Sequence, residues 1–158
     1  MREFCIFERI ENEEWNMGAA IIEVIEMVNM TKLRILIVDD ITSMRLLIKQ
    51  YLRMNDEVLV VGEASNGEEA LSKVQELQPD VVIMDMSLPG GSGVEVARKI
   101  KSMLPNIYIY LCSAYELDEF RDLNLDSPAD GFIQKSSMKP ELLAMIRKEL
   151  ERKNIVKK

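Results

Sequence analysis

The chain has 158 residues, of which 47% are hydrophobic and 30% charged, a balance typical of one soluble globular domain with its own core. A formal net charge of -7 argues against a nucleic-acid binder, and the lack of histidine excludes a histidine metal site, a histidine general base and a Ser-His-Asp triad. The two cysteines, Cys5 and Cys112, lie far apart, so neither a disulfide framework nor a cysteine zinc site is expected.

Residues 1–31 read as an acidic N-terminal extension. The extension lacks the basic start of a signal peptide, and its apolar stretch at 17–28 is too short to cross a bilayer, which favours a cytoplasmic protein. Helical spacing predicts an amphipathic helix over about 16–29, whose apolar side holds Met17, Ala20, Ile21, Val24, Ile25 and Val28. A helix this short is marginal by itself in water, so we expect it to dock on its own domain or on a second copy. The competing interpretation is a leader from a mis-assigned start, with the domain beginning at Met30.

From residue 33 onward, short apolar runs alternate with amphipathic ones. The expected strands are Leu33–Val38, Val58–Gly62, Asp80–Met84, Ile107–Leu111 and Gly131–Ile133. Helices are expected over Asn66–Leu77, after the capping box at Ser92, and over Met138–Lys153, where Leu142, Leu143, Ile146 and Leu150 share one side. Five strand–helix units in a row predict a doubly wound α/β domain with a parallel five-stranded sheet.

Polar side chains follow these strands where each one ends. Asp39 and Asp40 follow the first strand, Asp85 ends the third, Ser113 lies near the end of the fourth, and Lys135 follows the fifth. In open α/β sheets the ligand site lies beyond the carboxyl ends of the strands, so these five side chains should converge. A single aspartate after a strand is usually a turn residue, but five such residues at one edge indicate a site.

The residue types at this edge favour phosphoryl transfer. Three neighbouring carboxylates repel one another unless a cation lies among them, and ligands that are all hard oxygens predict Mg²⁺. A carboxylate can act as a nucleophile and form an acyl phosphate. Lys135 would neutralise charge on the transferring group, and Ser113 could donate a hydrogen bond to it.

The motifs that carry these residues resemble, in order, the signature of the response-regulator receiver domain of two-component signalling. They read ILIVDD at 35–40, VVIMDMSLP at 81–89, CSA at 112–114 and FIQK at 132–135, and the resemblance covers about residues 32–153. It implies a flavodoxin-like fold with strand order 2-1-3-4-5, and residues 154–158 remain as a basic tail. Because little chain follows residue 153, we expect a stand-alone, chemotaxis-type receiver without an output domain.

The resemblance also implies roles for single residues. Asp85 is the phosphoacceptor, and Asp39, Asp40, Asp85 and the backbone carbonyl of Ser87 hold Mg²⁺. Ser113 is the switch hydroxyl, Lys135 is the ion-pair partner of the phosphate, and Phe132 is either an aromatic rotamer switch or a plain core residue. Family members usually have proline after the lysine, in a cis peptide. Here Ser136 follows Lys135, so we expect a trans bond.

The function implied is a phosphorylation-controlled switch that accepts a phosphoryl group from a sensor histidine kinase or a phosphotransfer protein and catalyses only its own phosphorylation and dephosphorylation. A phosphorelay intermediate and a receiver that works without phosphorylation remain alternatives. A magnesium-dependent hydrolase of the haloacid dehalogenase type would need a second aspartate where Ser87 stands. A nucleotide or flavin site would need glycines after the first strand, where Asp39 and Asp40 stand instead.

The resemblance implies an output face made of the fourth helix, fifth strand and fifth helix. The expected fourth helix is acidic, through Glu116, Asp118, Glu119 and Asp122, whereas the fifth is basic, through Lys139, Arg147, Lys148, Arg152 and Lys153. This asymmetry could pair two copies, steer one downstream protein, or be no more than two solvated helix faces.

Overall fold

The computed structural model describes residues 16–114 and 127–157, with side chains as far as residue 154. The chain divides into two compact units, Met1–Thr31 and Lys32–Lys158. The expected acidic fourth helix lies outside the described residues. Among the described residues, no helix is both long enough and apolar enough to cross a bilayer.

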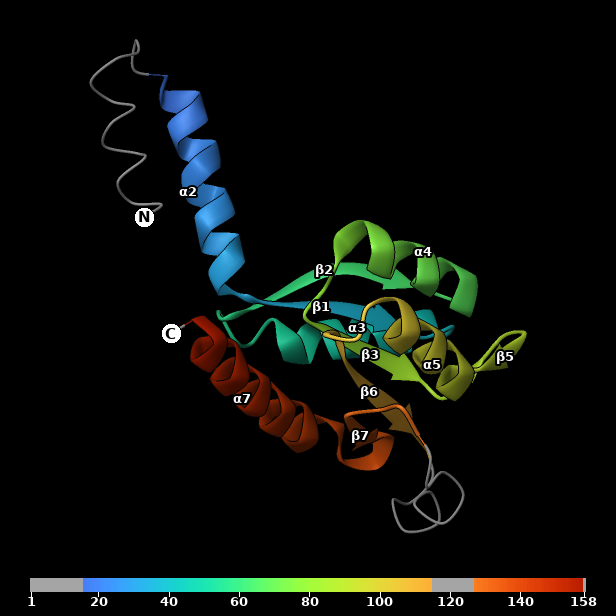
Figure 1. The fold of residues 1–158 in the computed structure, drawn as a ribbon. Coiled ribbons are helices and arrows are strands. Elements are labelled where there is room, and N and C mark those ends of the chain that lie inside the picture. The colour runs from blue at the N-terminus through green and yellow to red at the C-terminus, as the bar shows by residue number, and fades with distance from the viewer. Residues whose placement is uncertain (1–15, 115–126, 158) are drawn as a thin grey trace. The chain divides into compact units, whose positions relative to one another are not determined.

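The larger unit is built on a parallel five-stranded sheet (Figure 1). Its strands are β1 (Leu33–Val38), β2 (Val58–Ala64), β3 (Val81–Asp85), β6 (Tyr108–Ser113) and β7 (Gly131–Gln134). They run in the order β2-β1-β3-β6-β7, which confirms the predicted order 2-1-3-4-5. The strand bounds agree with the predicted runs to within two residues.

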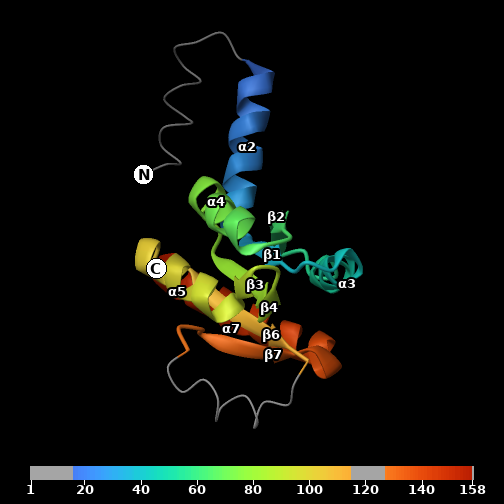
Figure 2. The ribbon, with the colours of Figure 1, turned by 90° about the vertical axis from the view of Figure 1, so that its right-hand side faces the viewer.

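Helices pack on both faces of this sheet because alternate strand residues point to opposite sides. On one face, Ile35 and Ile37 of β1 join a core with α3 (Thr42–Leu52) and α7 (Met138–Lys157). On the other face, Leu36 and Val38 join a core with α4 (Gly67–Leu77) and α5 (Gly93–Met103). In Figure 2, α3 and α4 accordingly lie on opposite sides of the sheet.

Side-chain caps begin two of these helices, and the one at Ser92 confirms the predicted capping box. Asn66 precedes α4, and its side chain accepts a hydrogen bond from the backbone N–H of Glu69 at 2.9 Å. Ser92 precedes α5 and accepts one from Val94 at 3.2 Å. Each cap satisfies a backbone donor that the first turn of a helix would otherwise leave unpaired.

The predicted apolar side of α7 needs one correction. Leu142 and Ile146 are buried as expected, but Leu143 is 38% exposed and Met145 is buried in its place. The sheet-facing side therefore runs through Met138, Leu142, Met145 and Ile146, whose spacing of three and four residues follows one face of a helix.

The basic side chains of α7 also divide into two groups. Lys153 binds Asp80 at 2.6 Å, and Arg152 lies 3.5 Å from Glu149 and stacks over the ring of Tyr108. Those two cations are therefore tied to the body of the domain. Lys139, Arg147 and Lys148 are exposed, so of the α7 side chains described as far as residue 154 these three form a basic outer face.

In the smaller unit, helix α2 (Met17–Thr31) confirms the helix predicted over 16–29. The Asn16 side chain caps its first turn, accepting from the backbone N–H groups of Gly18 and Ala19 at 3.1 and 3.3 Å. Within Met17–Thr31 no residue is buried. The docking of its apolar side therefore stays a prediction.

Candidate functional site

The carboxyl edge of the sheet brings together the residues that the sequence singles out. β1, β3, β6 and β7 are neighbours and run parallel, so their last residues meet at one edge. Asp39 and Asp40 directly follow β1, Asp85 is the last residue of β3, Ser113 is the last residue of β6, and Lys135 directly follows β7.

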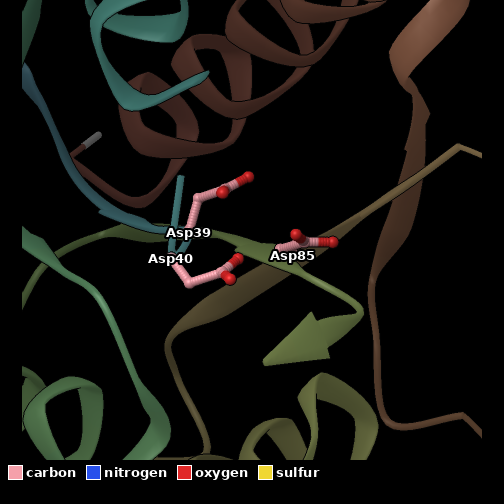
Figure 3. Close-up of side chains that lie close together, drawn as sticks. All are labelled: Asp39, Asp40 and Asp85. Atoms are coloured by element: carbon pink, nitrogen blue, oxygen red, sulfur yellow. The ribbon is translucent and has the colours of Figure 1, made fainter. Parts of the chain in front are cut away.

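Asp39, Asp40 and Asp85 form a compact acidic cluster (Figure 3). Each offers one carboxylate oxygen, and these oxygens all lie within 4.8 Å of one another. Asp39 is 1% exposed and Asp85 is 7% exposed, whereas Asp40 is exposed. The cluster thus has two buried carboxylates and one that faces solvent.

Backbone hydrogen bonds hold the two buried carboxylates in place. Oδ1 of Asp39 accepts from the N–H of Ile41 at 2.8 Å, and Oδ1 of Asp85 accepts from the N–H of Ser87 at 3.3 Å. Burial raises the pKa of the Asp39 carboxyl, and the neighbouring charge of Asp85 acts in the same direction, although the Ile41 hydrogen bond and Lys135 oppose it.

Lys135 is the cation at the centre of the site. Its Nζ lies 3.1 Å from Oδ2 of Asp85 and 3.4 Å from Oδ2 of Asp39, so one ammonium group bridges both buried carboxylates. Burial alone would lower the lysine pKa, but the hydrogen bond and charge of Asp85, with the charge of Asp39, raise it overall. One ammonium against three carboxylates leaves an excess of negative charge.

This excess charge, and the chemistry of the donors, fit a hard divalent cation. The cluster presents only oxygens, and Asp40 is open to solvent, so bound water could complete the coordination. Mg²⁺ takes oxygen ligands and usually keeps several waters. The acidic cluster is therefore consistent with a metal site.

A short hairpin next to Asp85 was not predicted from the sequence. Strands β4 (Ser87–Leu88) and β5 (Gly91–Ser92) pair antiparallel and bring the start of α5 back against the end of β3. The N–H of Gly93 donates to the carbonyl of Met86 at 2.8 Å. A Cβ at Gly93 would overlap the carbonyl oxygen of Asp85 and lie 3.0 Å from Cα of Met86. The three glycines in the loop after Asp85 were the available sequence signal.

Ser113 and Phe132 lie on the two strands beyond β3. Ser113 is 4% exposed, and its backbone pairs with Gln134 of β7. Phe132 is half-buried and packs against the apolar core shared with α4 and α5. The described residues contain no cis peptide bond, so the trans bond expected between Lys135 and Ser136 is confirmed.

Comparison with known proteins decides the family. Residues 35–147 match the response regulator receiver domain, a stretch that contains all five site residues. The chain belongs to this family. Receiver domains are typically signalling modules that partner with histidine kinases, and are not enzymes acting on separate substrates.

Two curated relatives show how this receiver compares with longer proteins. It is 38% identical over 115 residues to the response regulator GacA of Pseudomonas viridiflava, covering 73% of this chain and 54% of the relative. It is 32% identical over 123 residues to the response regulator protein VraR of Staphylococcus saprophyticus, covering 78% of this chain and 59% of the relative. The receiver thus spans little more than half the length of these relatives, and its predicted stand-alone, chemotaxis-type character is not established.

Solved structures share the fold. The response regulator domain of Thermotoga maritima CheB is similar at a TM-score of 0.68 and 31% identity, over 76% of this chain and 97% of that one. A LuxR-family response regulator from Aurantimonas is similar at a TM-score of 0.70 and 30% identity, over 76% and 86%. The CheB domain and the LuxR-family regulator therefore both share the receiver fold with this chain.

Proposed function

We propose that this receiver is a phosphorylation-controlled switch in which Asp85 accepts a phosphoryl group in the presence of Mg²⁺. The observation that carries the proposal is the arrangement of charges around Asp85. Its buried carboxylate lies 3.1 Å from the ammonium group of Lys135 and within 4.8 Å of the carboxylate oxygens of Asp39 and Asp40.

The step is the transfer of a phosphoryl group from a donor to the carboxylate of Asp85. A carboxylate oxygen of Asp85 forms a bond to phosphorus, and the bond between phosphorus and the donor breaks. The electron pair of the broken bond leaves with the donor, for example the imidazole nitrogen of a phosphohistidine, which then takes up a proton. The product is an acyl phosphate.

Residues around Asp85 would support this step through charge and position. Lys135 already bridges the two buried carboxylates, so a small displacement would bring its ammonium group onto a phosphoryl oxygen. The hydroxyl of Ser113, at the end of the adjacent strand, would donate a hydrogen bond to another phosphoryl oxygen. Both interactions stabilise negative charge that the transfer brings into the site.

Asp39, Asp40, Asp85 and the backbone carbonyl of Ser87 would hold the metal. When bound, Mg²⁺ supplies positive charge to the transferring group and offsets the repulsion within the cluster. The backbone N–H of Ser87 lies 3.3 Å from Oδ1 of Asp85, which supports the Ser87 backbone as a neighbour of the metal.

The upstream partner would be a sensor histidine kinase or a phosphotransfer protein. The output would pass through the face that includes β7 and α7, with Ser113 and Phe132 as the residues that respond to the phosphoryl group. Phe132 is half-buried on β7, so part of its side chain reaches the surface of this face. The exposed charges of Lys139, Arg147 and Lys148 would meet the downstream protein or a second copy.

Incubation with acetyl phosphate and Mg²⁺, followed by intact mass measurement, tests the proposal. The wild-type chain should gain one phosphoryl group, and hydroxylamine should remove it because acyl phosphates are labile to this nucleophile. Asp85→Asn should gain none, whereas Asp56→Asn, at an exposed aspartate between α3 and β2, should behave as wild type. A full mass gain in Asp85→Asn would refute the assignment. Continuous phosphate release from monoesters would favour the hydrolase alternative.

A further inference from the structure

The exposed apolar side of α2 belongs to the smaller unit, whereas all five residues of the phosphorylation site lie in the larger one. Seven large apolar residues over Met17–Val28 are between 40% and 58% exposed, namely Met17, Ile21, Ile22, Val24, Ile25, Met27 and Val28. A contiguous exposed apolar surface of this kind marks a site of interaction, because water contact with it is unfavourable.

The spacing of the exposed residues is that of a coiled-coil seam. Met17, Ile21, Val24 and Val28 are separated by four, three and four residues, which places Ile21 and Val28 at a positions and Met17 and Val24 at d positions. Ala20, Ile25 and Met27 flank this seam at e and g positions. β-branched residues at a positions are typical of helices that pair with helices.

The charges of α2 permit pairing with an identical helix. Its two charged residues, Glu23 and Glu26, fall at c and f positions, on the side away from the seam. Two copies can therefore meet along the seam without bringing like charges into contact. A helix with a charge at e or g in both copies would not have this property.

A membrane surface fits α2 less well than a second helix does. Helices that lie on membrane surfaces usually carry lysine and arginine on the polar side, and α2 has only acidic charges there. Docking on its own domain is the remaining alternative, and the measurements below distinguish it from self-association.

We propose that α2 is a self-association helix, through which two copies of this chain pair along the Met17, Ile21, Val24 and Val28 seam. The pairing does not depend on phosphorylation. A helix of 15 residues is about 22 Å long, too short for a standard interface of about 800 Å² per partner, so the pairing is weak and concentration-dependent.

Sedimentation equilibrium of the full chain without a phosphodonor tests the proposal, with Ile21→Glu and Ile22→Glu as matched variants. The two residues are adjacent and 52% and 58% exposed, and the substitutions add the same charge to the same helix. Ile21→Glu places that charge in the seam and should weaken self-association on the order of tenfold or more, whereas Ile22→Glu, at a b position, should change it less than twofold.

A disulfide cross-link gives an independent measurement. In a Cys5→Ser background, Val24→Cys should form an oxidised dimer readily when the two helices run parallel, because residues at d positions lie opposite their equivalents across a parallel seam. Glu26→Cys, on the outer side, should not. Cys112 is buried and does not compete.

Three results would overturn the proposal. The wild-type chain could remain monomeric at millimolar concentration, or both glutamate variants could weaken association equally. A third contrary result is a lower melting temperature of the monomer in Ile21→Glu with unchanged mass, which would show docking on its own domain. None of these depends on phosphorylation of Asp85, so the two proposals fail separately.

Discussion

Neutralising Asp40 should stabilise the metal-free receiver and remove most of its stabilisation by magnesium. Its carboxylate oxygen lies within 4.8 Å of those of Asp39 and Asp85. At this distance two unit charges repel by about 1–3 kcal/mol for effective dielectric constants between 80 and 20, and the exposure of Asp40 places it at the weak end. Asp40→Asn removes two such repulsions, so the metal-free domain should gain about 1–2 kcal/mol of unfolding free energy.

Magnesium should close most of this gap, because only the wild-type cluster keeps its full set of carboxylate ligands. A ligand at ten times its dissociation constant stabilises the state that binds it by about 1.4 kcal/mol. A domain of this size shifts by about 4 °C in Tm per kcal/mol. The wild-type Tm should therefore rise by about 5 °C at that Mg²⁺ concentration. Asp40→Asn should keep most of its gain over the metal-free wild type, and its Tm should rise little further when Mg²⁺ is added.

Thermal melts by circular dichroism, with EDTA and over a Mg²⁺ series, measure both effects. Asp56→Asn is the matched control, since it removes an exposed aspartate away from the cluster and should leave both values unchanged. A lower apo Tm in Asp40→Asn, or a magnesium shift equal to that of wild type, would refute the reasoning about repulsion and metal binding.

Three further predictions concern the edge of the site and the core. Gly93→Ala should lower the free energy of unfolding by about 1–3 kcal/mol and slow phosphorylation, because its Cβ would meet backbone atoms. Gly91→Ala should cost little, because the nearest neighbour of its Cβ would be 4.0 Å away. Urea unfolding and acetyl phosphate uptake compare the two variants. Because the pKa of Asp39 is raised, the folded metal-free domain keeps the proton of this carboxyl to a higher pH than the unfolded chain does. The free energy of unfolding should therefore fall as pH rises through the folded-state pKa. Asp39→Asn should abolish this dependence of stability on pH. Leu142→Ala should cost about 2–5 kcal/mol and Leu143→Ala less than about 1 kcal/mol, since the first is 1% and the second 38% exposed; equal costs in urea unfolding would contradict the corrected face of α7.

The sequence by itself determined the fold class, the strand order through family resemblance, and the five residues at the carboxyl edge. Strand identity is readable because buried parallel strands are short, nearly continuous apolar runs, and the site is readable because its residues stand directly where those runs end. The helix cap at Ser92 is equally local, since a cap depends on residues two or three positions away.

The tertiary structure decided what depends on contacts between distant segments. That Asp39 is buried while Asp40 is exposed, and that Lys135 bridges Asp39 and Asp85 from 96 and 50 residues away, follows from strand pairing. The same holds for Gly93, where a hairpin turns the chain back onto β3. Helical spacing placed Leu143 on the apolar side, whereas the packed structure buries Met145 instead. A helical pattern shows which residues share a side, and only the packed sheet shows which side is covered.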